Sequence, residues 1–300
     1  MSTTTYLTQP VKKSGWRRFF KAGREDSPFK RLLIHLALIC GCILAVYPVL
    51  RVVSVSLRPG DRLLSTSLAI IPPDATFDAY RSAVIDTEFP VWLWNSIAIT
   101  AATAIIGVVL AATSAYAFSR WRFVGRSPAM VFLLATQMIP APMLMVPIYI
   151  LAIKLDLVQT YRGLVIAYAV TAIPFSIWIL KGYYDTIPRD LEEAAYIDGA
   201  SPISAFWRIV LPLSTPALAI IFLFNFMQAW SDYLLARVMI SSARPLWTWV
   251  LGVQSFQSQF TTQWGLFAAS SIIVTIPVMA LFLYSSRWLI SGLTLGSVKG

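Results

Sequence analysis

The sequence has few charged residues for its length, and this shortage excludes a water-soluble domain. Asp, Glu, Lys and Arg make up 13% of the 300 residues, about half of the share that is usual in soluble domains. Hydrophobic residues make up 57%, and the mean hydropathy is +0.69. Several apolar runs reach or approach the roughly 20 residues that cross a bilayer core as a helix. We therefore expect an integral membrane protein.

Histidine and cysteine are also scarce, which limits the chemistry open to the chain. The single histidine, His35, excludes a multi-histidine metal site and disfavours histidine-based catalysis. Cys40 and Cys42 lie in the first apolar run, where core packing is favoured over a disulfide. The sequence contains no Gly-x-x-x-x-Gly-Lys-Ser/Thr loop, so the chain has no evident means of binding ATP itself. We expect no catalytic residue, metal ion or cofactor on this chain.

Six apolar segments are long enough to be transmembrane spans. We expect them near residues 32–50, 93–118, 129–152, 163–180, 211–230 and 266–286. Segments of this length satisfy their backbone groups in lipid only as helices, because barrel strands are about half as long and alternate in polarity. The basic segment before the first span has no small-residue cleavage pattern, so we expect that span to remain in the mature protein. The predicted fold class is all-α, a polytopic transmembrane helical bundle.

The distribution of Lys and Arg predicts the orientation of the bundle. The net charge is +10, but the basic residues cluster between the spans, so we expect contact with membrane lipid and not with nucleic acid. The side that holds both termini carries about twice as many Lys and Arg residues as the other side. By the positive-inside rule, both termini are cytoplasmic. The predicted parts are a basic cytoplasmic segment (1–31), a transmembrane domain (32–290) and a cytoplasmic tail (291–300).

One predicted cytoplasmic loop, residues 187–212, is longer than a connector needs to be. Pro188 suits the first turn of a helix, and Gly199 can adopt the left-handed conformation that ends one. Ser201 and Pro202 then predict the start of a second helix, as its N-cap and its first residue. The predicted helix is too polar to span a membrane and carries small and apolar residues on one face. From the residues alone, it could dock in a groove of a cytoplasmic partner or rest on lipid headgroups.

The same loop resembles the EAA motif of ABC importer permeases. The resemblance rests on Glu193-Ala194-Ala195, on Gly199 after three intervening residues, and on Ile209-Val210-Leu211-Pro212 after nine more. In that family the motif forms a coupling helix that sits in a cleft of the ATP-hydrolysing subunit. The resemblance implies that Glu193 faces basic groups of the ATPase, that the paired alanines allow close contact, and that Gly199 makes the turn. The implied coupling residues are Glu192, Glu193, Ala194, Ala195, Asp198, Gly199, Leu211 and Pro212.

Most of the chain, from about residue 31 to residue 300, is similar to the maltose-type carbohydrate permeases, and more narrowly to their shorter, MalG-like subunit. The similar segments are Ser56-Leu57-Arg58, Asn95-Ser96, 115–120 and 292–300. The resemblance implies a type I ABC importer permease fold in the plasma membrane of a prokaryote. It also implies a contact between the C-terminal tail and the ATPase through Ser297, Val298, Lys299 and Gly300.

The partners and the cargo follow from the same resemblance. It implies a homologous second permease subunit, two cytoplasmic ATPase subunits that bind ATP and Mg, and an extracytoplasmic solute-binding protein. The implied cargo is a carbohydrate, with maltose-like or trehalose-like sugars and oligosaccharides expected first. Uronic-acid oligosaccharides and glycerol phosphates remain open, because related permeases carry them.

Polar residues and prolines interrupt several predicted spans. Ordinary helix packing explains most of them, so Gln137, Asn225 and Gln228 are weak candidates for the translocation path. An ion-coupled secondary transporter is the rival reading. Proton-coupled carriers usually have acidic residues within their helices, which the central spans lack, but a sodium site made of backbone carbonyls would not need them. A membrane scaffold protein is a third reading, with less reason for an EAA-type loop.

Overall fold

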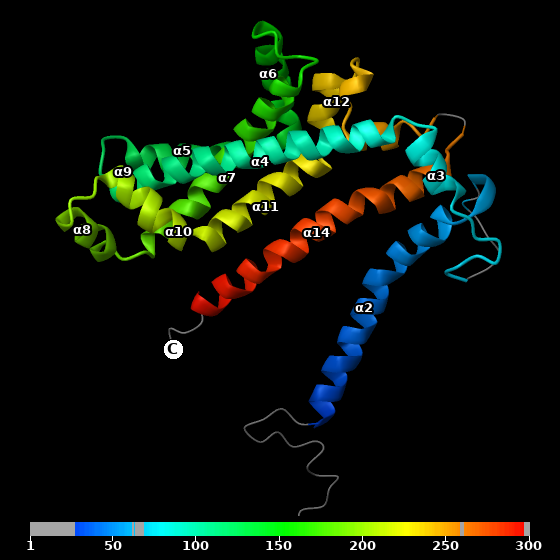
Figure 1. Ribbon diagram of the computed structural model, residues 1–300, viewed down its shortest axis with the longest axis horizontal. Helices are drawn as coiled ribbons and strands as arrows, with labels where there is room; N and C mark the ends of the chain where they lie inside the picture. The colour runs from blue at the N-terminus through cyan, green and yellow to red at the C-terminus, as the bar shows by residue number, and fades with distance from the viewer. Residues whose placement is uncertain (1–27, 62, 64–68, 259–260, 297–300) are drawn as a thin grey trace, which may run out of the picture.

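The computed structural model describes residues 28–61, 63, 69–258 and 261–296 of the chain, and helices form its framework (Figure 1). The longer helices are α2 (Pro28–Ser56), α4 (Phe89–Arg120), α5 (Arg126–Gln137), α6 (Ala141–Lys154), α7 (Tyr161–Asp185), α11 (Thr215–Ser231) and α14 (Trp264–Gly296). The shorter helices are α3 (Asp78–Ile85), α8 (Asp190–Ile197), α9 (Pro202–Ala205), α10 (Leu211–Leu213), α12 (Leu234–Ile240) and α13 (Trp249–Gln254). Within the described residues, extended pairing is limited to one isolated bridge, between Gln257 and Thr262. The predicted all-α class is confirmed.

Four of the described helices, α2, α4, α7 and α14, are long and apolar enough to cross a membrane. Two further pairs of helices, α5 with α6 and Pro202–Leu213 with α11, are also long and apolar enough if each bent pair counts as one span. The described residues therefore contain up to six spans. The six predicted spans all fall on these helices. The chain is therefore a multi-pass membrane protein, as the composition predicts.

The third predicted span is not one continuous helix. α5 and α6 meet at an angle of 105°, and the chain between them contains Pro140. Proline cannot donate the helical N–H bond and disfavours helical backbone in the residue before it, so it explains the break. The single continuous helix expected over 129–152 is therefore wrong, because the segment forms two helices with a sharp bend between them.

The core of the bundle is built around α4, which packs chiefly against α7 and α11. Figure 1 shows these helices running side by side, with α14 along α11. Small side chains at Ala111, Ala112 and Ala115 are buried, and small residues let helix backbones approach closely. A β-carbon at Gly107 of α4 would lie 2.6 Å from Nδ2 of Asn225 on α11. The contact between α4 and α11 therefore favours glycine at this position.

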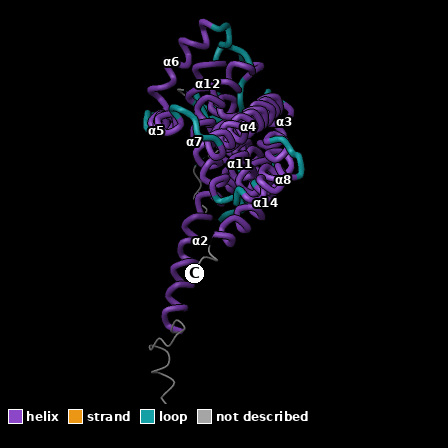
Figure 2. Tube along the Cα trace, turned by 90° about the vertical axis from the view of Figure 1, so that its left-hand side faces the viewer, coloured by secondary structure: helices purple, strands orange, loops and turns teal. Residues whose placement is uncertain are grey.

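The first span, α2, packs against α14 and then diverges from the bundle (Figures 1 and 2). Its most apolar window contains no buried residue. Cys40 and Cys42 are exposed free thiols rather than the core residues that the sequence predicts. Their exposure has a simple cause, because no other described helix covers this part of α2.

Candidate functional site

The predicted coupling loop folds as α8 followed by α9, beside the C-terminal end of α4 (Figure 1). The first turn of α8 is acidic, which complements the positive end of the helix dipole. Gly199 follows the helix with a φ of 83°, a left-handed conformation that favours glycine. The Ser201 side chain accepts a hydrogen bond of 3.2 Å from the Ser204 amide and caps α9. The predicted helix is present and Gly199 follows its end, but it begins at Asp190, so Pro188 precedes the helix and does not lie in its first turn.

Glu192 is turned into the bundle, and only 2% of the residue is exposed. One of its carboxylate oxygens accepts a hydrogen bond of 2.5 Å from Nε of Arg120, and the other accepts one of 2.7 Å from the Tyr116 hydroxyl. Both partners lie near the end of α4, and the Arg120 side chain is also buried. Separating a buried ion pair leaves uncompensated charge, which is strongly unfavourable. α8 is therefore fixed to α4 by its own acidic turn.

Arg120 also joins α7 to this network. Its guanidinium donates to the carbonyl oxygens of Tyr184, at 2.9 Å, and Ile187, at 3.2 Å, at the end of α7 and just beyond it. Arg189, which precedes α8, donates to the carbonyl oxygen of Ser119 on α4, at 3.0 Å. The ends of α4 and α7 and the start of α8 are thus held together as one unit.

Sequence reasoning gave Tyr116 and Arg120 no role, although both lie in a segment that resembles the family. The available signal was a basic residue at the end of an apolar span together with an acidic pair in a later loop. Neither feature alone says which carboxylate Arg120 meets. Glu192 was expected to serve the ATPase contact, and the structure instead buries it inside the chain.

The other predicted coupling residues of α8 and the turn after it face outward. Glu193, Ala194, Asp198 and Gly199 are exposed, and Ala195 is half-buried. Apolar side chains of α8 are exposed as well: Leu191 is 45% and Ile197 is 88% exposed. A helix outside the membrane gains nothing from showing these side chains to water, so such a surface indicates a contact with another molecule. We call Leu191, Glu193, Ala194, Ile197 and Asp198 the α8 face.

Leu211 and Pro212 lie at the junction between the loop and the fifth predicted span. Pro202–Leu213 and α11 meet there at 77°. Leu211 packs against the buried core, and Pro212 is exposed. Ser214, between the two segments, is buried and donates from its hydroxyl to the carbonyl oxygen of Val210, at 2.6 Å. The two residues mark a bend in the chain, and their predicted part in the ATPase contact stays a prediction.

Two of the three path candidates come together, and the third does not. Gln137 of α5 donates to the carbonyl oxygen of Thr171 on α7, at 3.3 Å, and Gln228 of α11 donates to the Thr171 hydroxyl, at 3.4 Å. Asn225 is buried instead, and its side-chain oxygen accepts a hydrogen bond of 3.0 Å from Ser176. Thr171, a residue that sequence reasoning did not select, is the point where the two glutamines meet.

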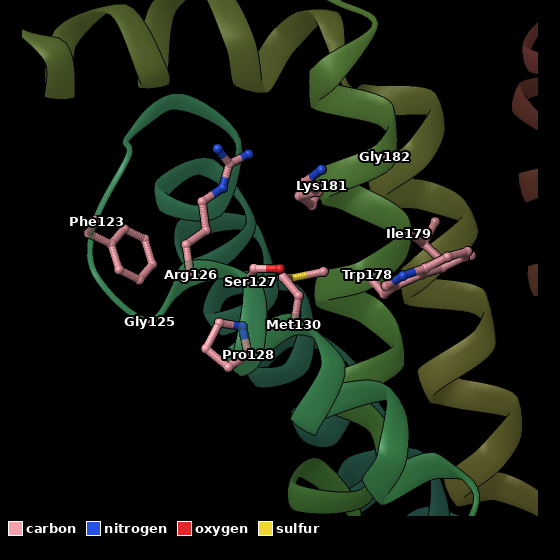
Figure 3. A pocket seen from close by; sticks show the side chains of 10 residues that line it. All are labelled: Phe123, Gly125, Arg126, Ser127, Pro128, Met130, Trp178, Ile179, Lys181 and Gly182. Atoms are coloured by element: carbon pink, nitrogen blue, oxygen red, sulfur yellow. The ribbon is translucent and has the colours of Figure 1, made fainter.

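A separate open hollow lies between the start of α5 and the C-terminal part of α7 (Figure 3). Arg126 and Lys181 extend over it from these two helices, and Trp178 flanks it. Lys181 pairs with Asp185 one turn later, at 2.6 Å. The basic side chains of this hollow belong to the side of the bundle that is predicted to be cytoplasmic from the distribution of Lys and Arg. The cytoplasmic placement of the termini stays a prediction.

Ser297, Val298, Lys299 and Gly300 lie outside the described residues, so the predicted contact of the tail with an ATPase also stays a prediction. In the part of the chain that the structure describes, no group of three or more His, Cys, Asp or Glu residues could hold a metal ion.

The family model for inner-membrane components of binding-protein-dependent transport systems matches residues 103–294, a range that contains α8 and both of its buried partners. The chain belongs to this family. It is a MalG-like ABC permease, a component of a transporter rather than an enzyme.

Its relatives include the maltose/maltodextrin transport system permease protein MalG of Salmonella typhimurium. That protein is 37% identical over 295 residues, with 92% of this chain and 98% of the relative covered. MalG of Escherichia coli K12 is 35% identical over 290 residues, with 90% and 96% covered. The similarity therefore extends over nearly the whole of both chains.

The fold is also that of a solved ABC importer permease. One chain in the crystal structure of a bacterial ABC transporter involved in the import of the acidic polysaccharide alginate aligns with a TM-score of 0.77. The alignment covers 87% of this chain and 96% of that chain, at 23% identity. At this identity the likeness shows the fold alone.

Proposed function

We propose that this chain forms half of the translocation pathway of an ATP-driven, binding-protein-dependent importer of a carbohydrate. In this proposal it pairs with a homologous permease subunit, two cytoplasmic ATPase subunits that hold ATP and Mg, and an extracytoplasmic solute-binding protein. The single observation that carries the proposal is the α8 face, an exposed apolar and acidic surface on a helix that a buried ion pair fixes to the bundle.

The α8 face has the properties that docking in an ATPase cleft requires. Ala194 and Ala195 are small enough for close backbone approach, and Leu191 and Ile197 provide apolar area that a partner can cover. Glu193 is exposed and so is available to a basic group of the ATPase. A helix that merely rested on headgroups would have less need of two buried bonds to Glu192.

Coupling requires that motion of the docked helix reaches the spans. The network around Arg120 links α8 to α4 and α7, so the closure of an ATPase dimer would displace these elements as a rigid unit. ATP can drive transport only if it favours different states of the pathway at different steps. The buried network supplies the mechanical connection for that change of state.

Maltose-like or trehalose-like sugars and oligosaccharides are the cargo that we propose first. Support comes from MalG relatives that are named for maltose and maltodextrin transport and match this chain over nearly its full length. The solved transporter with the related fold imports alginate, an acidic polysaccharide. Uronic-acid oligosaccharides are therefore the alternative cargo to include in any assay.

The test is ATP hydrolysis by the complex, co-purified with its partner subunits and placed in lipid discs. The variants are Glu193→Lys, which reverses the charge on the α8 face, and Gly199→Asp, which strains the turn after α8. Asp86→Lys is the matched control, because Asp86 is an exposed acid that precedes the opposite end of α4. Each protein is assayed with and without the solute-binding protein and candidate sugars.

We expect Glu193→Lys and Gly199→Asp to weaken association with the ATPase or to abolish sugar-stimulated hydrolysis, while Asp86→Lys retains ATPase association. The sugar that stimulates the wild type identifies the cargo. Normal stimulation in both α8 variants would show that α8 is not the coupling element. If no sugar stimulates the wild-type complex, the carbohydrate proposal fails.

A further inference from the structure

The open hollow between the start of α5 and the C-terminal part of α7 has no part in the proposed coupling to an ATPase (Figure 3). Its volume is about 840 Å³, within the range of about 300–1,000 Å³ that is common for ligand sites. Its lining joins two kinds of surface, basic side chains from both helices and apolar side chains that include Met130, Trp178 and Ile179. A ligand that matches this lining has a negatively charged part and an apolar part.

The charged part of the hollow is basic. Arg126 and Lys181 are the charged residues among the described residues that line it. Within the described part of the chain, the Arg126 guanidinium makes no hydrogen bond or ion pair. Lys181 donates to one carboxylate oxygen of Asp185, at 2.6 Å, and the Ser119 hydroxyl donates to the other, at 2.7 Å. Asp185 is thus engaged at both oxygens, and Arg126 and Lys181 keep donors for an anion.

The order of side chains along α7 indicates that the hollow lies at the membrane surface. The apolar part of this span leads to Trp178, which is 46% exposed, and then to Lys181 one turn later. Tryptophan is enriched at the boundary between lipid and water, and basic residues lie just outside it. The loop before α5 has a similar character, because Phe123 and Val124 expose apolar side chains directly after Arg122. Such a combination suits the level where acyl chains meet headgroups.

We propose that this hollow binds an anionic phospholipid, with Arg126 and Lys181 on its phosphate and Met130, Trp178 and Ile179 against the first part of its acyl chains. Basic pockets between transmembrane helices are suited to anionic headgroups. A zwitterionic lipid is a poorer ligand, because its ammonium group would lie beside the two basic side chains. A free phosphate ester is also a poorer ligand, because it leaves the apolar walls uncovered. The site does not depend on the identity of the cargo.

The test is native mass spectrometry of the purified transporter complex, which counts the lipids bound at each added concentration. The probes are phosphatidylglycerol and phosphatidylethanolamine with the same acyl chains, each added to the complex in detergent. Arg126→Gln removes one positive charge from the hollow, and Arg126→Lys keeps it. Arg162→Gln is the matched control, because Arg162 is an exposed arginine at the opposite end of α7.

Gly182→Leu tests the hollow itself without changing its charge. Gly182 lines the hollow, and a β-carbon added to it has no atom within 4 Å. The larger side chain therefore enters open space and displaces no packed neighbour. Leucine is also a better helix former than glycine, so α7 is retained in this variant.

We expect the wild-type complex to bind phosphatidylglycerol at least about fivefold more tightly than phosphatidylethanolamine. Arg126→Gln should weaken binding of phosphatidylglycerol about fivefold, the effect of one basic residue near an anionic lipid, while Arg126→Lys and Arg162→Gln should change it less than about twofold. Gly182→Leu should weaken binding of both lipids, because it removes space and not charge.

Equal affinity of the wild type for the two lipids would overturn the inference, as would an equal loss in Arg126→Gln and Arg162→Gln. Displacement of phosphatidylglycerol by free glycerol phosphate would assign the hollow to a soluble anion instead. If Gly182→Leu releases a partner subunit and leaves lipid binding unchanged, the hollow is a contact between subunits and the inference is wrong. None of these results bears on ATP hydrolysis or on the cargo, so the proposed function is tested separately.

Discussion

Breaking the ion pair between Arg120 and Glu192 is expected to detach α8 from the bundle without removing the α8 face. Arg120→Met keeps an unbranched stem of similar length and leaves the Glu192 carboxylate buried at 2% exposure without its cation. Removal of one partner of a buried pair costs about 3–5 kcal/mol. The variant also loses the bonds to the carbonyl oxygens of Tyr184 and Ile187, so its cost should lie at the upper end of that range.

The double variant Arg120→Met, Glu192→Met separates the charge effect from loss of the contact. Both charges are gone, and the space is filled by apolar side chains, a replacement that is often nearly neutral for buried pairs. We therefore expect the double variant to be more stable than the sum of the single changes predicts, with a coupling energy of about 1–3 kcal/mol. Lys181→Met is the control, because the pair of Lys181 with Asp185 is partly exposed and should contribute about 0.5 kcal/mol.

The measurements are the unfolding equilibrium in mixed micelles and hydrogen exchange of the amides of α8. A loss of 3–5 kcal/mol lowers the folded-to-unfolded ratio by roughly two to nearly four orders of magnitude. Exchange in α8 should rise more than exchange in the middle of α4. If Arg120→Met is no less stable than Lys181→Met, or if α8 exchanges as slowly as in the wild type, the buried pair does not anchor the helix.

Two further predictions concern glycines. Gly107→Ala should cost about 1–3 kcal/mol of unfolding free energy, because its β-carbon would lie 2.6 Å from the Asn225 side chain, and Asn225→Ser should recover part of that loss. The control is Gly41→Ala, whose new β-carbon has no atom within 4 Å. Equal stability of both alanine variants would refute the contact. Gly199→Ala should destabilise the turn after α8 by about 1–2 kcal/mol, and Gly199→Asn should destabilise it less, since asparagine tolerates a φ of 83° better than alanine does. Equal hydrogen exchange of α8 in the two variants would show that the left-handed conformation does not determine the stability of the turn.

The spans could be predicted because, in a bilayer, the composition of a single segment decides whether it forms a spanning helix. A run of about 20 apolar residues has few alternatives to a helix in lipid, so its position follows from composition alone. The helix in the predicted cytoplasmic loop is equally local, since Pro188 shortly before its start and Gly199 just after its end are both visible in the sequence. The size of the bend at Pro140 was not predictable, because packing against the neighbouring helices sets the angle.

The contacts of polar residues were out of reach of the sequence because they join distant segments. Glu192 and Arg120 are 72 positions apart, and either Glu192 or Glu193 could have been the buried member of the acidic pair. Asn225 and Gln228 are close in α11, yet one is buried against Ser176 and the other reaches Thr171. Because residues three positions apart lie on the same face of a helix, both side chains meet α7, and only the placement of α7 against α11 decides that one contacts Ser176 and the other Thr171.

The proposed coupling element and the contact between Thr171 and Gln228 are connected through α7 and α11. α7 carries Thr171, and Arg120 links the end of α7 to α8 through the Ile187 carbonyl oxygen and the Glu192 carboxylate, so motion of α8 would be passed to α7. α11 carries Gln228 but is joined to α9 through the 77° bend at Ser214, which can absorb part of the displacement. Motion of α8 would therefore shift Thr171 relative to Gln228 and strain the long hydrogen bond between them. In the proposed importer, ATP-driven closure would in this way alter the contact between α7 and α11, the kind of change of state that transport requires.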